Sequence, residues 1–356
     1  MQLLSRMNRQ STILSSLVSI ILGLVVGAIL MLVAGYDPLV AYSALFRSGF
    51  LDMYGVGESI RTLTPLLLTG LAVALAFRTG LFNIGVEGQL IIGQLAAVIV
   101  ALKLDLPPGL HAAVAVIVGG IAGGLWAFLP GLLKATRGVH EVITTIMMNF
   151  IALYLSNVLV RTWLTSGADS TDPIPESASL KMSFFSDWFG GARIHFGFII
   201  ALVMVIVMYF LLWRTTWGFQ MRAVGFNPDA SEYAGINVRK NIILSMMISG
   251  SFAGLAGAGE VLGTYEYLFI QDAFSGIGFD GIAVALLGAN TPVGVVLSSI
   301  LFGVLTFGGS EMQYDAQVPF EVIRVVFAAI IFFVAANVTS WFLERFRLGR
   351  KVNSHE

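Results

Sequence analysis

Apolar runs long enough to cross a membrane recur along this chain and are separated by short polar stretches. A helix of about 20 apolar residues is what spans the hydrocarbon core of a bilayer. The chain has 57% hydrophobic and 12% charged residues, whereas soluble domains average roughly 25% charged residues. The sequence therefore predicts an all-α polytopic membrane protein.

We divide the chain into ten membrane segments and one helix lying on the outer surface, 36–50. The first segment follows Arg6 and Arg9, is too long for a signal peptide and lacks a small-residue cleavage site. The segment 279–289 is too short to span alone, so crossing and re-entry both stay open. The ten segments are 11–34, 61–77, 85–102, 111–133, 141–163, 196–213, 241–263, 279–289, 293–309 and 318–342.

The basic residues predict the orientation. In this topology thirteen of the twenty Lys and Arg face the cytoplasm, six face outward, and Arg324 lies in the last segment. Such a bias obeys the positive-inside rule and places both termini in the cytoplasm. Residues 1–356 would then form one transmembrane domain, with halves 1–213 and 241–356 joined by a cytoplasmic loop, 214–240.

Short internal echoes predict an inverted repeat. Phe82-Asn83 precedes the third segment and Phe279-Asp280 leads the eighth, while VHEVI at 139–143 and FEVI at 320–323 open the fifth and tenth. In the predicted topology the members of each pair run in opposite directions, as inverted repeats do. The matches are short, and chance similarity is the alternative.

The loop 214–240 is a long polar interruption and carries the densest basic charge. It contains a short helix with both ends marked: Asn227 suits the N-cap, Pro228 the first helical position, and Gly235 a left-handed end. A helix of about two turns is marginal by itself, because nucleation costs more than so few hydrogen bonds return. Either it is held against a partner or the stretch is an ordinary solvated loop.

The most distinctive string is LFNIGVEGQ at 81–89, followed by Gly93-Gln94. Its polar side chains at membrane depth must find partners inside protein, and such groups often mark a transport pathway. Close helix packing, with Glu87 near an aqueous rim, is the alternative interpretation.

Several classes of function are disfavoured by what the sequence lacks. It has no cysteine, and its four histidines are scattered without ligand spacing, so we expect no metal site. A net charge of −1 gives no general attraction to nucleic acid. No Gly-x-x-x-x-Gly-Lys-[Ser/Thr] motif and no catalytic constellation occur, so we expect no catalytic residues and no enzyme activity in this chain.

Four blocks, in the same order, resemble one family: LFNIGVEGQ at 81–89, VHEVITTIMMNF at 139–150, RAVGFNP at 222–228 and FDGIAVALLG at 279–288. The chain resembles the membrane permeases of ABC importers for ribose-type sugars, branched-chain amino acids and nucleosides. The resemblance covers about residues 60–342 and is closest to the guanosine-type nucleoside permeases.

The resemblance implies that 227–235 is a coupling helix seated in a cleft of a separate cytoplasmic ATPase. Its sequence is similar to the Glu-Ala-Ala…Gly signature of importer permeases, although Asp229 and Ser231 depart from it. The residues expected to couple to the ATPase are Arg222, Gly225, Asn227, Pro228, Asp229, Ala230, Glu232, Tyr233 and Gly235. Those expected along the substrate pathway are Phe82, Asn83, Glu87, Gln89, Gln94, Asn149 and Asn290.

The resemblance also implies a setting: a multi-pass protein of a bacterial cell membrane that takes nucleosides from an extracytoplasmic binding lipoprotein. A second, related permease would complete a heterodimer. No cofactor is expected in this chain, because ATP and Mg²⁺ would bind the ATPase subunit.

Three alternatives stay open. Ribose or another simple sugar could replace nucleosides as the substrate. An ion-coupled secondary transporter would also fit broken helices and repeats, but it calls for charged groups paired at the bilayer centre, whereas the charges here gather at segment ends. A membrane scaffold without transport would leave the polar groups at 83–94 without a purpose.

Overall fold

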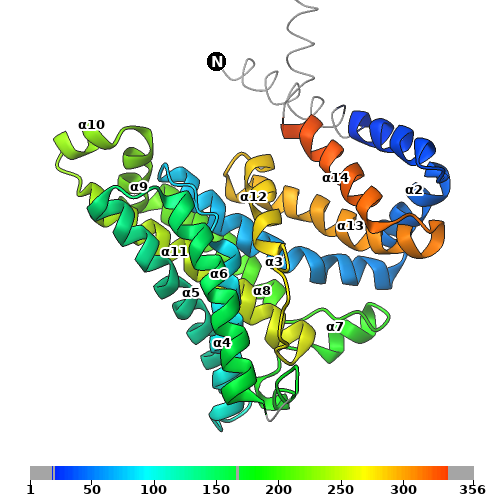
Figure 1. The fold of residues 1–356 in the computed structure, drawn as a ribbon, viewed down its shortest axis with the longest axis horizontal. Coiled ribbons are helices and arrows are strands. Elements are labelled where there is room, and N and C mark those ends of the chain that lie inside the picture. Colours follow the sequence, from blue (N-terminus) through cyan, green and yellow to red (C-terminus); the bar gives the residue numbers. More distant parts are fainter. Residues whose placement is uncertain (1–17, 19–20, 166–167, 336–356) are drawn as a thin grey trace, which may run out of the picture. The chain divides into compact units, whose positions relative to one another are not determined.

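The computed structural model describes residue 18, residues 21–165 and residues 168–335, most of them helical (Figure 1). No β-strand occurs in these residues, only two isolated bridges, which confirms the all-α prediction. The helices are α2 (Pro38–Phe46), α3 (Met53–Arg78), α4 (Val86–Lys103), α5 (Leu110–Arg137), α6 (Glu141–Leu159), α7 (Ser183–Trp188), α8 (Gly197–Arg214), α9 (Thr216–Phe226), α10 (Pro228–Tyr233), α11 (Val238–Gly259), α12 (Ile277–Leu287), α13 (Pro292–Ala316) and α14 (Phe320–Ala335).

Seven helices in the described residues are long and apolar enough to cross a membrane. This confirms a multi-pass integral membrane protein, while ten crossings, the side of the termini and the inverted repeat stay predictions. Two shorter apolar helices, Ile21–Val33 and Ile277–Leu287, accompany them. The seven are Met53–Arg78, Val86–Lys103, Leu110–Arg137, Glu141–Leu164, Gly197–Arg214, Val238–Tyr265 and Pro292–Ala316.

Helix α3 begins eight residues before the predicted segment 61–77. The Asp52 carboxylate caps its first turn by accepting from Gly55 N at 3.3 Å. Glu58 and Arg61 lower the hydropathy of the start of α3, so the apolar pattern begins only after them. In the structure these two charges are paired, since Arg61 Nε donates to Glu58 Oε2 at 2.6 Å. A buried ion pair within one turn lets an apolar helix carry two charges.

The prediction of a single short helix in 214–240 is incomplete, because a second helix, α9, precedes it. Thr215 caps α9, its Oγ1 accepting from Gly218 N at 3.1 Å. The sequence of α9 mixes glycine, glutamine and arginine with three aromatic residues. It therefore has no apolar periodicity by which the helix could be predicted. The polar connection is therefore helical along most of its length.

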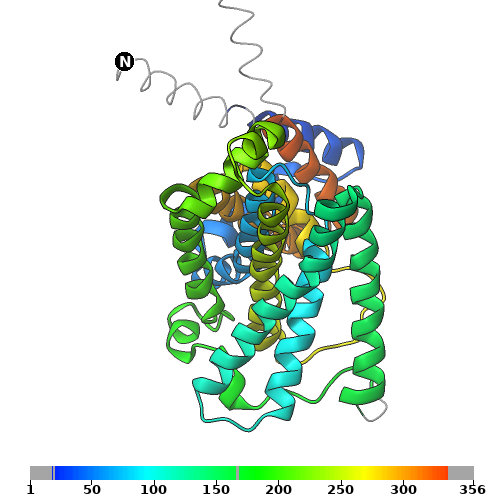
Figure 2. The ribbon, with the colours of Figure 1, turned by 90° about the vertical axis from the view of Figure 1, so that its left-hand side faces the viewer.

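The described chain forms two compact units, and α13 runs from one into the other. In the larger unit (Asp52–Val304), α4, α5 and α11 pack together at its core, with α4 and α5 side by side (Figure 2). A Cβ at Gly93 would lie 2.4 Å from the Gly254 carbonyl oxygen, and one at Gly254 2.3 Å from that of Gly119. Glycine is required there because the three helix backbones nearly touch.

The smaller unit (Met1–Leu51 and Leu305–Glu356) contains α2, the end of α13 and α14. Tyr42 Oη donates to Leu24 O at 2.6 Å, and a Cβ at Gly27 would lie 2.6 Å from Val326 Cγ1. Arg47 forms an ion pair with Asp315. The predicted helix at 36–50 is present as α2 with a π-helical turn after it, and the predicted segments 11–34 and 318–342 extend partly outside the described residues.

Candidate functional site

A buried hydrogen-bond network occupies the start of the 82–94 segment. Asn83 Nδ2 donates to Ser249 Oγ at 2.8 Å and to Gln89 Oε1 at 3.0 Å. Ser249 Oγ in turn donates to Ala72 O at 2.7 Å, so the network joins α3, α4 and α11. The Asn83 side chain has no exposed surface and the network satisfies it, as polar groups at membrane depth require.

Glu87 is the most heavily used side chain of this segment. It is fully buried, and its carboxylate accepts from Gly278 N at 2.6 Å, Ser275 Oγ at 2.7 Å and Gly276 N at 3.0 Å. These groups belong to the start of α12 and the turn before it. The unpaired N–H groups of a helix start carry partial positive charge, which a carboxylate neutralises. Glu87 therefore ties α4 to the start of α12 through a carboxylate buried within the protein.

Asn149 on α6 completes the arrangement from the other side of α4. Its Oδ1 accepts from Gly88 N at 2.8 Å and its Nδ2 donates to Ile84 O at 3.0 Å. A Cβ at Gly88 would lie 2.8 Å from Asn149 Cα, so only glycine admits α6 this close. The turn that begins α4 is thus held by side chains from three directions.

Two of the predicted pathway residues keep an unused acceptor. Gln94 is 4% exposed, and its Oε1 has no hydrogen-bond partner among the residues that the structure describes. Asn290 Oδ1 is likewise buried and unpartnered there. Phe82 is half-buried and its ring lies 5.1 Å from that of Phe77. Gln94 and Asn290 take no part in the hydrogen-bond network around Asn83.

At the α10 end of the larger unit, the local geometry follows the sequence prediction. Asn227 Oδ1 accepts from Ala230 N at 3.0 Å, Pro228 takes the first helical position, and Gly235 has a φ of +82°. The predicted capped helix is confirmed. Tyr233 is 99% exposed and Phe226 85% exposed, so large aromatic side chains protrude where charged ones are the norm.

The backbone before α10 packs directly on the end of α3. A Cβ at Gly225 would lie 2.3 Å from Arg78 O, and Gly80 has a φ of +77° with Gly225 Cα 3.2 Å from its Cβ position. Both residues must be glycine for the two segments to touch. Phe82 and Asn83 follow Gly80 by two and three residues, so a single turn of chain joins this contact to the 82–94 segment.

Sequence reasoning missed Arg78, which it counted as a flanking charge, and Ser249 and Ser275, which no local pattern marks. Arg78 Nε donates to Asn290 O at 2.8 Å and its Nη2 to Ala289 O at 3.1 Å. The only sequence signal for Arg78 is its position as the charge that ends an apolar segment next to Gly80.

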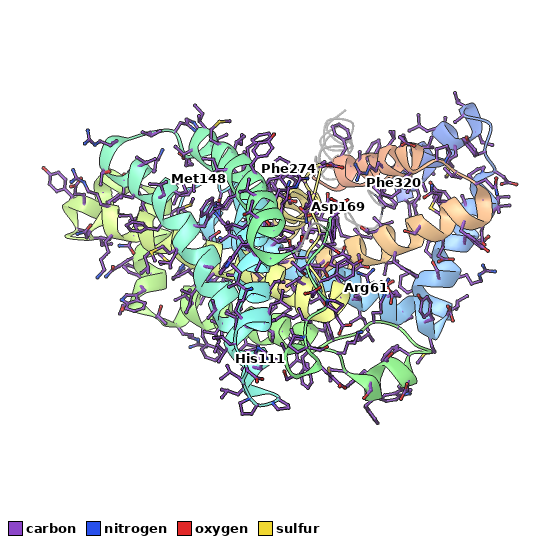
Figure 3. The ribbon with its side chains drawn as sticks, turned by 60° about the horizontal axis from the view of Figure 1, so that its bottom comes forward. Arg61, His111, Met148, Asp169, Phe274 and Phe320 are labelled. Carbon is purple, nitrogen blue, oxygen red and sulfur yellow. The ribbon has the colours of Figure 1, made fainter. Side chains whose placement is uncertain are left out.

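The loop between α6 and α8 lies at the end of the larger unit opposite α10, as α7 shows in Figures 1 and 2. Arg193 N donates to Glu58 Oε1 at 2.8 Å and Arg193 Nη2 to Glu58 Oε2 at 3.1 Å. The Glu58 carboxylate raises the pKa of Arg193 above its usual range. His111, labelled in Figure 3, bonds through Nδ1 to Ser177 Oγ of this loop at 2.9 Å.

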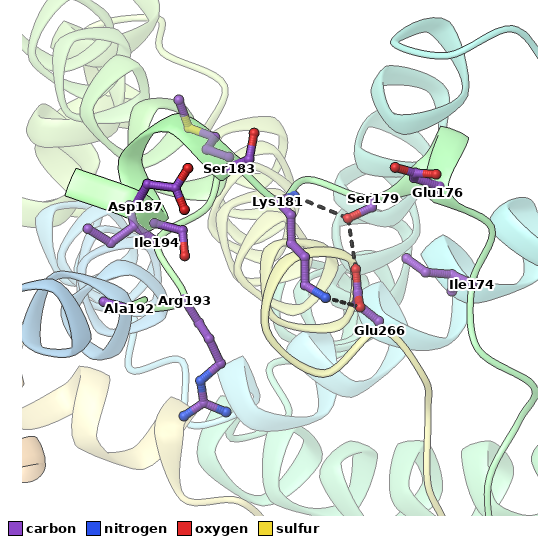
Figure 4. A pocket seen from close by; sticks show the side chains of 12 residues that line it. Ile174, Glu176, Ser179, Lys181, Ser183, Asp187, Ala192, Arg193, Ile194 and Glu266 are labelled. Carbon is purple, nitrogen blue, oxygen red and sulfur yellow. Dashed lines mark hydrogen bonds and ion pairs between the residues drawn. The ribbon is translucent and has the colours of Figure 1, made fainter. Parts of the chain in front are cut away.

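A cavity of about 670 Å³ lies in this loop region and is lined by residues of α7 and by Glu266. Figure 4 shows its lining side chains. Ser179 Oγ donates to Glu266 Oε1 at 2.9 Å, and Lys181 forms an ion pair with the same carboxylate. Arg193, also in the lining, is paired with Glu58. Both cations of the lining are already matched, so the cavity offers a small anion no unpaired cation.

Comparison with known proteins finds similarity to transport permeases along nearly the whole chain. Residues 55–336 match the family described as branched-chain amino acid transport system / permease component. The chain is 53% identical to the guanosine ABC transporter permease NupP of Bacillus subtilis (strain 168), covering 96% of this chain and 97% of that protein. No solved structure matches the chain.

Two further relatives are similar over most of their length. The nucleoside ABC transporter permease NupB of Lactococcus lactis subsp. cremoris is 40% identical, over 93% of this chain and 92% of that protein. A glucose ABC transporter permease of Haloferax volcanii is 32% identical, over 93% of this chain and 88% of that protein.

Proposed function

Since this chain belongs to the family of branched-chain amino acid transport system permease components, we propose that it is the membrane-spanning subunit of an ATP-driven importer of nucleosides. The observation that carries the substrate class is 53% identity to a guanosine permease along 96% of the chain. ATP hydrolysis belongs to a separate subunit, and ATP and Mg²⁺ bind there.

The proposed orientation places α10 in the cytoplasm and the 164–196 loop outside. It follows from the excess of Lys and Arg on the α10 side, which the positive-inside rule assigns to the cytoplasm. Ten membrane segments with both termini inside, arranged as an inverted repeat, remain part of this proposal. The 164–196 loop then faces an extracytoplasmic binding lipoprotein that delivers the substrate.

In this function α10 is the coupling helix. It is short and capped, it presents Tyr233 to solvent, and Phe226 at the end of α9, two residues before α10, is also exposed. An ATPase cleft would cover these aromatic side chains and supply the tertiary contacts that a six-residue helix lacks. Movement of the ATPases would reach the membrane through the contact between Gly225 and the end of α3.

The substrate pathway is proposed along the 82–94 segment. Asn83, Gln89 and Asn149 are bonded within the protein, so they shape the segment. Gln94 Oε1 is buried and unpartnered, so it could accept a hydrogen bond from a donor group of a nucleoside. We therefore expect Gln94 to contact the passing substrate, with weak affinity because the permease must release it.

A second, related permease subunit is proposed to complete the transporter as a heterodimer. The exposed apolar side chains on α5 and α6, among them Ile117, Ile121, Ile143 and Tyr154, give lipid or such a partner a surface to cover. An ion-coupled carrier is the less favoured mechanism, since it has no use for an exposed capped helix such as α10.

The proposal is tested by the ATPase activity of the purified complex with its binding protein, over a panel of nucleosides and sugars. Asp229→Arg puts a positive charge at the positive end of α10, and Gly235→Pro cannot adopt the φ of +82°. The matched control is Asp105→Arg, in an exposed loop between α4 and α5.

Stimulation by nucleosides that both α10 variants abolish and the control retains is the expected result. Stimulation by sugars alone would overturn the nucleoside assignment. A sugar is the alternative substrate, because the chain is also similar to a glucose permease. Uptake that follows an ion gradient, with no ATPase bound to the permease, would overturn the importer itself.

A further inference from the structure

We propose that α12 transmits the movement of the coupling helix to the substrate pathway, and that Arg78 and Glu87 are the positioning residues that hold its two ends. This inference rests on the proposed importer function. It concerns which part of the membrane domain moves, which the resemblance to known permeases does not specify.

Helix α12 is too short to be an ordinary membrane span. Its 11 residues extend about 16 Å at 1.5 Å per residue, roughly half of the ~30 Å hydrocarbon core. A helix that ends within protein or lipid must have its terminal N–H and C=O groups satisfied by something other than water. The Glu87 carboxylate accepts from N–H groups at the start of α12, and the N–H groups of the turn 288–290 donate to its last carbonyls. Arg78 in turn binds the carbonyls of that turn.

The two charges match the two ends of the helix dipole. Glu87 accepts from the N–H groups of Gly276 and Gly278 at the positive end. Arg78 donates through Nε and Nη2 to the carbonyl oxygens of Asn290 and Ala289 just beyond the negative end. Each pairing is favourable; the one with Glu87 is buried, whereas the one with Arg78 is partly exposed. Helix α12 is therefore held at its start by Glu87 of α4 and just beyond its end by Arg78 of α3.

The turn after α12 shows that its carbonyl groups are held in place. Ala289 and Asn290 have φ values of +51° and +53°, in the left-handed region. This region costs a residue with a side chain roughly 1–2 kcal/mol. The two strained residues are those whose carbonyls Arg78 binds, so the guanidinium stabilises a turn that these residues disfavour by themselves.

The chain segment just before the coupling helix α10 contacts α3 at Arg78. The backbone of Gly225, three residues before Pro228, packs on Arg78 O. The Arg78 guanidinium lies 5.7 Å from the centre of the Trp213 ring, and that of Arg222 lies 5.9 Å from the same ring. Arg222 Nε is buried without a hydrogen-bond partner in the described part of the chain. Because Arg222 lies on α9, a shift of α9 moves one of two like charges that share one indole ring.

The far end of α12 leads into the pathway segment. In the first turn of α4, Glu87 directly precedes Gly88 and Gln89, which are bonded to Asn149 and Asn83. Along its side, α12 packs on α3 through small residues, with a Cβ at Gly281 only 2.5 Å from Thr69 Oγ1 (Figure 1). A displacement at Arg78 is thus passed along a rigid, closely packed helix to the residues that shape the start of α4.

The first test measures whether α12 moves. The chain contains no cysteine, so nitroxide labels can be placed at Leu286→Cys on α12 and Leu125→Cys on α5, both exposed positions. In the assembled complex, the distance between the labels is expected to change on addition of a non-hydrolysable ATP analogue. An unchanged distance, in a complex whose ATPase and uptake are active, overturns the proposal while leaving the importer function intact.

The second test asks whether Arg78 carries the movement. Arg78→Lys keeps the charge but loses the two-pronged contact with Ala289 and Asn290, and Arg78→Gln loses both. The matched control is Arg137→Gln, an exposed arginine that ends α5. Both Arg78 variants are expected to retain ATPase binding and basal hydrolysis, to lose at least tenfold in uptake, and to lose the change in label distance.

Uptake and distance change at control levels in both Arg78 variants would overturn the role of Arg78. A complex in which Arg78→Gln fails to assemble leaves the decision to Arg78→Lys. Loss of coupling in Asp229→Arg together with normal coupling in Arg78→Lys would remove this inference alone, whereas the absence of any bound ATPase would remove the proposed function on which it rests.

Discussion

The α10 helix and the 82–94 segment are both rich in polar residues, but they use them in opposite ways. In α10 the polar groups act locally: Asn227 caps its own helix, and Tyr233 extends into solvent. In the 82–94 segment the polar groups act at long range: Glu87 bonds to residues 188–191 positions away, and Asn83 to Ser249.

The difference shows which part of the molecule needs a partner subunit. A buried polar group that is fully bonded has nothing left to offer another molecule, whereas an exposed aromatic side chain on a short helix gains by being covered. We therefore expect substitutions in the 82–94 network to destabilise the permease itself. Substitutions on the surface of α10 should leave the isolated permease unchanged and affect only the complex.

The largest effect is expected for Glu87→Leu. The change removes an acceptor of three hydrogen bonds and leaves two N–H groups without their partner, that of Gly278 buried and that of Gly276 partly buried. Each buried donor left without a partner costs about 1–3 kcal/mol, so the two N–H groups together make this the largest loss. Thermal unfolding of the purified permease in detergent, followed by helical circular dichroism, measures the loss.

Glu232→Leu is the matched control, since Glu232 lies exposed on α10. It is expected to unfold within about 0.5 kcal/mol of the unchanged protein, as surface substitutions do. Equal destabilisation by the two changes would contradict the contrast between the buried segment and α10.

Burial also makes the stability of the permease depend on pH, through a histidine at the end of the larger unit opposite α10. His195 Nδ1 accepts from Gly197 N at 3.1 Å, and its Nε2 lies 3.3 Å from Thr264 Oγ1. Burial, reinforced by the nearby Arg61, lowers the pKa of His195 to about 4. The folded chain thus keeps the ring neutral at a pH where the unfolded chain takes up a proton.

Stability is therefore expected to fall as the pH drops from about 6.5 toward 4, by about 3 kcal/mol in total for a shift of this size. Unfolding measured at pH 7 and at pH 4.5 gives the loss, and His195→Gln should remove most of it. A pH dependence identical in the variant and in the unchanged protein would show that other groups are responsible.

How far the sequence could predict these regions depends on where their partners lie in the chain. Asn227, Pro228 and Gly235 mark their own helix within nine residues, so the capped helix could be predicted. Glu87 and Arg78 owe their roles to α12 and the turn after it, which lie 191 and 212 residues later, and no local pattern shows which distant backbone a side chain will meet. The sequence identified the 82–94 segment as unusual but could not supply its partners.

The same argument explains the errors in the helix boundaries. The start of α3 lies outside the predicted segment 61–77 because Glu58 and Arg61 look like a charged loop until they are seen as a pair with Arg193. Helix α9 was missed because its stability comes from packing against α8, α10 and α11, and not from an apolar stripe of its own. Hydropathy predicts the helices that face lipid, and it underestimates those that face other protein.

A smaller effect is expected for Ser249→Ala. Ser249 Oγ accepts from Asn83 Nδ2 and donates to Ala72 O. Asn83 keeps its bond to Gln89, so the cost is that of a typical hydrogen bond, about 1 kcal/mol. Thermal unfolding in detergent measures it, and Ser251→Ala on the same helix serves as the control, because Ser251 Oγ bonds only to its own helix at Met247 O. A loss of 3 kcal/mol or more would mean that the network cannot re-form without Ser249.

The smallest effect on the isolated permease, and the sharpest contrast, is expected for Tyr233→Ala. The side chain is 99% exposed and supports nothing within the described chain, so the free energy of unfolding should change by less than about 0.5 kcal/mol. In the complex the same ring is expected to lie in the ATPase cleft, where truncating a buried aromatic anchor typically weakens binding by 2 kcal/mol or more, about thirtyfold. Co-purification and titration of the ATPase subunit against the permease in lipid nanodiscs measure this difference. Unaltered ATPase affinity would mean that α10 docks through its backbone and caps alone, and a destabilised permease would mean that α10 belongs to the fold in the way the 82–94 segment does.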